Sequence, residues 1–142
     1  MANNRAVRLH GYGGPDTVTV DDVAVPQPGP QQVLVRVAVA GMNPFDRKLR
    51  SGALRDQFPL TLPVTLGAEV AGTVEALGGG ATGLTVGRRV VAWTGNLGAY
   101  ARLVASGEIR ATVGRTVAFE DAAAGIEQLG AGAVGKTVLQ VR

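Results

Sequence analysis

Residues that could take part in chemistry gather in one short stretch of the sequence. It holds four basic and two acidic side chains, at Arg47, Lys48, Arg50, Arg55, Asp46 and Asp56. Such a cluster is either a solvated basic face or a site for an anion or a carbonyl group. Both interpretations stay open, because the two carboxylates lie among the cations.

Several other kinds of chemistry are excluded. The sequence has no cysteine and one histidine, His10, so disulfides, thiolate zinc sites, cysteine nucleophiles and multi-histidine metal sites are ruled out. A net charge of +3 is too small to indicate nucleic-acid binding. The first ten residues lack the apolar stretch of a signal peptide, and no apolar run approaches the roughly 18 residues that span a bilayer. We expect a cytoplasmic protein that does not bind membranes.

Two glycine patterns resemble dinucleotide-binding motifs. G-x-G-x-x-G occurs twice, at Gly78, Gly80, Gly83 and at Gly130, Gly132, Gly135. In a true dinucleotide site these glycines follow a strand and open a helix. The first pattern is followed by a predicted strand, and the second leaves seven residues, too few for a crossover and another strand. Both are predicted to be turns.

The elements that must position these residues are mostly strands. The 142 residues fit one domain. Strands are predicted at 5–10, 18–25, 33–40, 70–77, 86–93, 108–113 and 137–141, with little pattern at 101–107. Asn43 and Pro44 indicate the N-cap and the first residue of a short helix that ends at Ser51 and Gly52. A second helix is predicted at 119–129, where apolar residues recur at helical spacing. Neighbouring strands without crossover helices favour antiparallel or barrel-like pairing.

Several segments, taken in order, resemble a known family. They are 10–16 (HGYGGPD), 41–46 (GMNPFD), 50–52 (RSG), 66–74 (LGAEVAGTV), 86–90 (VGRRV) and 98–100 (GAY), then 103–110, 119–124 and 135–139. Together they resemble the GroES-like catalytic domain of medium-chain dehydrogenase/reductases, in the quinone oxidoreductase branch. The resemblance covers nearly the whole sequence.

The resemblance implies a fold: a partly open β-barrel with one C-terminal helix, forming a single domain over 1–142. Residues 1–100 would be its N-terminal part, and 101–142 would complete it. In the family a Rossmann domain lies between these parts. Here they are almost adjacent, and no βαβ unit of about 30 residues fits in what remains. We therefore expect no Rossmann domain and no bound coenzyme.

The resemblance also implies roles for single residues. Zinc-dependent members carry cysteine where Asn43 stands and histidine where Ala68 stands, so no metal is expected. Asn43 would orient a carbonyl group, or only cap the helix. Asp46 is a candidate general acid/base or a structural residue. Lys48 replaces a tyrosine common in quinone reductases, and is a candidate proton donor or a surface residue. These three are the predicted catalytic set.

Four further residues are predicted to line the substrate pocket: Arg50, Glu69, Trp93 and Tyr100. For Glu69 the alternative is a structural ion pair with an arginine. For the two aromatic residues the alternative is core packing.

These inferences favour a non-redox enzyme that acts on a small carbonyl or enone compound by positioning and acid/base catalysis: cyclisation, isomerisation, dehydration or addition, for instance in natural-product biosynthesis. One alternative is an NADPH-dependent quinone or enone oxidoreductase whose partner supplies the nucleotide domain. Another is a non-catalytic binding module or an engineered domain deletion. The surface left by the missing domain predicts a homodimer.

Overall fold

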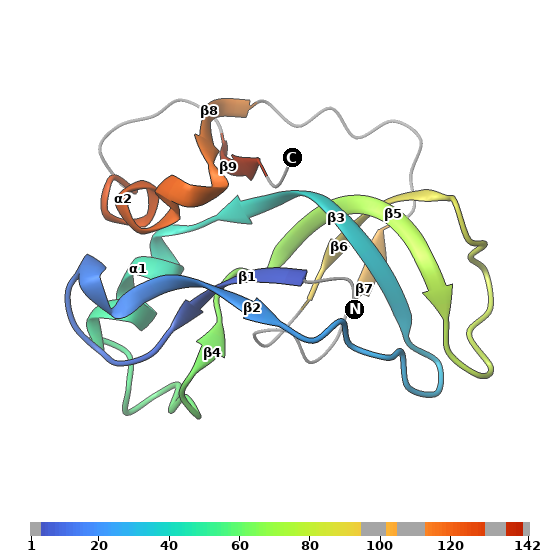
Figure 1. The fold of residues 1–142 in the computed structure, drawn as a ribbon, viewed down its shortest axis with the longest axis horizontal. Coiled ribbons are helices and arrows are strands. Elements are labelled where there is room, and N and C mark those ends of the chain that lie inside the picture. Colours follow the sequence, from blue (N-terminus) through green and yellow to red (C-terminus); the bar gives the residue numbers. More distant parts are fainter. Residues whose placement is uncertain (1–3, 95–101, 105–112, 130–135, 141–142) are drawn as a thin grey trace.

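The structure, a computed structural model, describes residues 4–94, 102–104, 113–129 and 136–140. Strands dominate this part of the chain, together with two short α-helices, α1 (Pro44–Ser51) and α2 (Ala122–Glu127), and two 3₁₀ turns, η1 (Pro15–Thr17) and η2 (Phe119–Asp121). The strands form two sheets, neither of which closes on itself (Figure 1). The predicted fold class, mainly β with short helices in a partly open barrel, is confirmed.

The smaller sheet has three strands in the order β2-β1-β4. The strands β1 (Asn4–Leu9) and β2 (Val18–Val23) pair antiparallel, and the two-residue β4 (Val64–Thr65) lies along the other edge of β1. The predicted strands at 5–10 and 18–25 are therefore confirmed. The sequence did not predict β4, which gains its strand geometry from pairing with β1 rather than from a pattern of its own.

The larger sheet has six strands in the order β7-β6-β5-β3-β9-β8. Its centre is built from β3 (Val33–Met42), β5 (Glu69–Leu77) and β6 (Arg89–Trp93), which are antiparallel neighbours (Figure 1). The strand β7 (Arg102–Val104) extends one edge, in a stretch where the sequence showed little pattern. The other edge consists of β9 (Lys136–Gln140) and β8 (Val113–Ala118). Most of the predicted strand at 108–113 lies outside the described residues.

One expectation about the C-terminal part was wrong. The strands β8 and β9 are parallel, and α2 lies between them in the sequence, so β8, α2 and β9 form a βαβ unit. We expected no room for such a unit because a typical one takes about 30 residues or more. The helical part of this crossover is short, because η2 and α2 cover only residues 119–127.

The main core lies where α2 packs against the two sheets. It is formed by buried side chains from β1, β2, β3, β8, η2 and α2 and from Leu129 just after α2: Val7, Leu9, Val18, Met42, Val117, Phe119, Ala122, Ile126 and Leu129. The amphipathic spacing at 119–129 that predicted a helix is thus the spacing of core residues. The C-terminal segment supplies five of these nine core residues.

The first glycine pattern is a turn, as predicted. Gly80 and Gly83 have φ angles of +74° and +80°, a conformation that favours glycine. A Cβ atom at Gly78 would lie 1.8 Å from the carbonyl oxygen of Gly29, so only glycine fits there. The second pattern, at 130–135, lies outside the described residues.

Candidate carbonyl-binding site

Asn43 stands at the junction of β3 and α1. Pro44 begins α1, and the Asn43 backbone is extended, as in a helix N-cap. Its N–H donates to the Asp46 carboxylate at 2.7 Å, which forms part of a capping box. The cap predicted from the sequence is confirmed. The Asn43 side chain also reaches across to β5, where its Nδ2 lies 3.5 Å from Oε2 of Glu69.

Trp93 joins these residues through the strand register. Gly41 on β3 lies opposite Glu69 on β5, and Glu69 lies opposite Trp93 on β6. Directly opposed residues in antiparallel strands project from the same face of a sheet. Glu69 is half-buried, and the Trp93 side chain is 52% exposed. Asn43, Glu69 and Trp93 therefore share one end of the β3-β5-β6 face; we call them the Asn43 group.

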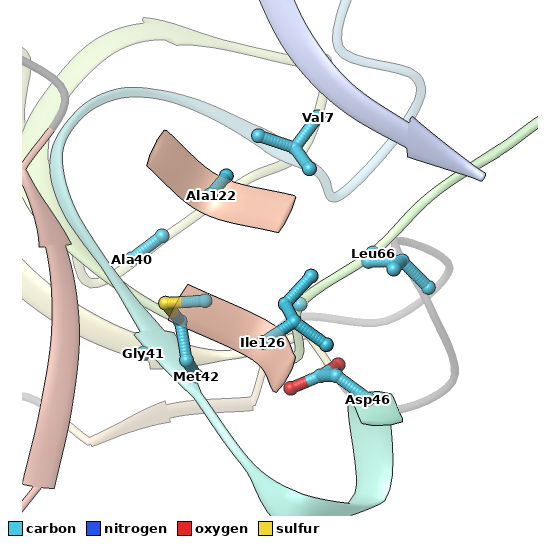
Figure 2. A pocket seen from close by; sticks show the side chains of 9 residues that line it. Val7, Ala40, Gly41, Met42, Asp46, Leu66, Ala122 and Ile126 are labelled. Carbon is cyan, nitrogen blue, oxygen red and sulfur yellow. The ribbon is translucent and has the colours of Figure 1, made fainter. Parts of the chain in front are cut away.

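Asp46 contacts the Asn43 backbone, but its side chain is buried in the interior. The residue is 3% exposed and reaches a small pocket of about 30 Å³. Figure 2 shows its carboxylate beside Ile126, among otherwise apolar walls from β1, β3 and α2. Small-molecule sites usually measure about 300 Å³ or more. This pocket is therefore too small for a carbonyl substrate, and the contacts of Asp46 that are described here serve the helix cap.

Arg50 and Lys48 differ sharply in their surroundings. Arg50 is 4% exposed; its Nη1 donates to the carbonyl oxygen of Gly13 at 2.7 Å, and its Nη2 pairs with Glu127 of α2. It thus ties α1 to the loop after β1 and to α2. Lys48 is exposed. Residues two apart on a helix point to different sides, so Lys48 does not converge with Asp46.

The predicted site residues therefore fall into two groups, one gathered on the sheet face and one placed elsewhere. The structure brings Asn43, Glu69 and Trp93 together, and it places Asp46 and Arg50 in buried structural contacts and Lys48 in solvent. Tyr100 lies outside the described residues.

Two relevant residues were not found from the sequence. Glu127 pairs with Arg50 across 77 residues of chain, and nothing local signals that pairing. Thr94 follows Trp93; its N–H donates to the carbonyl oxygen of Ala68 at 2.6 Å, and its hydroxyl is buried with no hydrogen-bond partner within the described ranges. A threonine at a strand end has no distinctive pattern.

The residues at the zinc positions do not fit a metal ion, and the first glycine pattern does not fit a dinucleotide. Asn43 and Ala68 offer an amide and a methyl group, which are not zinc ligands. In the part of the chain that the structure describes, no three His, Cys, Asp or Glu residues are placed to hold a metal ion. The first glycine pattern leads into β6 rather than a helix, so it offers no phosphate cradle.

Comparison with known families assigns the chain. The sequence profile of the alcohol dehydrogenase GroES-like domain matches residues 29–140. The chain belongs to this family. The GroES-like domain is also 42% identical over 98 residues to human quinone oxidoreductase, covering 68% of the chain and 29% of that protein. It is 41% identical over 100 residues to the Pseudomonas aeruginosa quinone oxidoreductase, covering 70% and 30%. The resemblance to the quinone oxidoreductase branch of the medium-chain dehydrogenase/reductases is confirmed.

Solved structures agree with this assignment. The human synaptic vesicle membrane protein VAT-1 homolog-like protein superposes with a TM-score of 0.63 at 35% identity, covering 72% of this chain and 32% of that one. The Escherichia coli quinone oxidoreductase complexed with NADPH gives a TM-score of 0.61 at 25% identity, covering 72% and 33%. The GroES-like domain spans about 30% of the length of its curated relatives, and their Rossmann part is absent from these 142 residues. No described helix is long and apolar enough to cross a membrane.

Proposed function

We propose that this domain provides the carbonyl-binding surface of a zinc-free quinone or enone reductase, with the nicotinamide held by a nucleotide-binding domain outside these 142 residues. The observation that carries the proposal is the Asn43 group. An amide donor is fixed by its place at a helix cap and by contact with Glu69, and the strand register puts the exposed Trp93 directly opposite Glu69 on the same face. An amide N–H can hold a carbonyl oxygen, and an indole can pack on a planar conjugated ring.

The relatives support a reductase over a non-redox enzyme. They are named quinone oxidoreductases, and a Burkholderia relative, 38% identical over 97 residues, is named 2-haloacrylate reductase. Asp46 and Lys48 were the expected acid/base residues; Asp46 is buried at the helix cap and Lys48 faces solvent, which favours structural and surface roles for them. Non-redox catalysis, a homodimer and a cytoplasmic location stay predictions; light scattering would check the dimer.

Trp93 provides a direct binding assay, because it is the single tryptophan of the sequence. We expect benzoquinone or a simple enone to quench its fluorescence saturably. Asn43→Ser keeps a good cap residue but removes the amide, and the loss of one hydrogen bond should raise the Kd about fivefold. Gln57→Ser removes an exposed amide elsewhere and should leave the Kd unchanged. Equal Kd values for all three proteins would refute the carbonyl site.

A chimera tests the redox part of the proposal. The matched segment of the Pseudomonas aeruginosa quinone oxidoreductase would be replaced by the corresponding residues of this chain. We expect NADPH oxidation that depends on added quinone or enone, and that weakens with Asn43→Ser. Conversion of an enone by the unmodified chain without NADPH would instead support the non-redox alternative and contradict the proposal.

A further inference from the structure

A row of cationic side chains crosses the same face of the larger sheet, some distance from the Asn43 group. Arg36 on β3 lies opposite Thr73 on β5, and Thr73 lies opposite Arg89 on β6. Thr73 is four residues along β5 from Glu69, so the two project from the same face. The row therefore places two guanidinium groups on either side of a hydroxyl, on the face that carries the Asn43 group.

Within the described residues, no carboxylate neutralises this row. Arg36 and Arg89 are exposed, and the ion pairs observed there involve other cations. The acidic residue nearest to Thr73 along β5 is Glu75, and it takes part in none of the ion pairs between described residues. Guanidinium groups match carboxylates and phosphates in geometry and charge. The unneutralised row thus suits an anionic group.

An apolar strip connects the cationic row to the Asn43 group. Exposure alternates along β6: Val90 and Ala92 are buried, whereas Arg89, Val91 and Trp93 face outward. Val91 is 47% exposed and Trp93 is 52% exposed, so the strip offers uncovered apolar surface. Arg89 and Trp93 are four positions apart on the strand, a rise of about 13 Å. A cation, the apolar strip and the tryptophan of the Asn43 group thus follow one another along β6, and Asn43 itself lies across β5 at the end of β3.

From this arrangement we infer the substrate class: an amphipathic enone with a carboxylate or phosphate at the end remote from its carbonyl group. This inference rests on the proposed function. The carbonyl oxygen lies at Asn43, the hydrocarbon part covers Val91 and Trp93, and the anionic end meets Arg36 and Arg89. Charge complementarity specifies the occupant, because a neutral quinone would leave the cationic row unused.

The test compares one ligand with and without its charge. The probes are a linear enone carboxylic acid whose extended chain covers at least the rise of about 13 Å between Arg89 and Trp93, and its methyl ester. Binding of each to the full chain is followed by Trp93 fluorescence. We expect the acid to bind about fivefold more tightly than the ester, because exposed guanidinium–carboxylate contacts are individually modest. Added salt should reduce this ratio, whereas a neutral ligand should respond little.

Matched variants assign the charge effect to the row. Arg36→Gln and Arg89→Gln should each lower the acid-to-ester ratio toward one, while ester binding is kept. Arg55→Gln removes another exposed arginine, 67% exposed in the loop after α1, and should leave the ratio unchanged. The same comparison with the corresponding alkyl phosphate distinguishes a phosphate preference from a carboxylate preference.

Three results would overturn the inference. Equal affinity for acid and ester in the unmodified protein would refute it while leaving the carbonyl site intact. A ratio that survives both Arg36→Gln and Arg89→Gln would place the anion elsewhere. Failure of both ligands to bind, together with failure of benzoquinone, would refute the carbonyl site and the substrate class together.

Discussion

Replacing Arg50 with methionine should destabilise the domain by about 1.5 to 4 kcal/mol. The side chain is 4% exposed, so its stem packs in the interior, and methionine keeps most of that volume. The substitution removes the charge-assisted hydrogen bond to Gly13, and bonds to charged groups contribute about 1.5 to 3 kcal/mol. The pair with Glu127 adds about 0 to 1 kcal/mol, because Glu127 is half exposed and can be rehydrated.

The assay is urea unfolding followed by circular dichroism, with Lys48→Met as the matched control. Both substitutions remove a cation from the last turn of α1, so they lose the same favourable interaction with the helix dipole. Only Arg50 is buried, and Lys48→Met should therefore cost less than about 1 kcal/mol. If Arg50→Met were no more destabilising than Lys48→Met, the contacts of Arg50 with Gly13 and Glu127 would contribute nothing to stability.

Three further predictions concern other parts of the fold. Gly78→Ala should lower the free energy of unfolding by about 1 to 3 kcal/mol, because the new Cβ would overlap a backbone oxygen. A Cβ at Gly79 meets no atom within 4 Å, so Gly79→Ala should lower it much less, and urea unfolding compares the two variants. Ile126→Ala should cost about 2 to 5 kcal/mol by enlarging the pocket beside it, and an unchanged unfolding midpoint would contradict the core assignment. The hydrogen bond from Thr19 lowers the pKa of Asp21, and His10 lowers it further. The Asp21 carboxylate therefore stabilises the folded state above its unfolded pKa, and this stabilisation is lost as the pH falls through the lower folded pKa. In an NMR titration, Thr19→Val should raise the pKa of Asp21.

Local patterns predicted the elements that carry their own signals. The alternation at 33–40 predicted β3, which continues two residues further because Gly41 and Met42 still pair with β9. Asn43 and Pro44 predicted the start of α1. By contrast, β7 is a three-residue edge strand that owes its conformation to β6, and a partner strand cannot be identified from a short stretch without pattern.

The candidate site was predictable only in part, for the same reason. The Asn43 group comes together through strand register, and the residue types alone suggested its members. The burial of Arg50 depends on Gly13 and Glu127, which lie 37 and 77 residues away. A charged residue in a polar stretch is usually exposed, so the sequence pointed to a pocket or a solvated face instead. Long-range partners decided the outcome.

The position of β9 constrains the order in which the domain can be assembled. This strand lies between β3 and β8, although it follows β3 by about ninety residues of chain. Contacts so distant in sequence form slowly, because a long loop must close first. Until β9 is made and docked, one edge of β3 stays open and can pair with strands of other chains. During synthesis the domain should therefore be most prone to aggregate just before its last strand emerges, and β3 is the segment to shield.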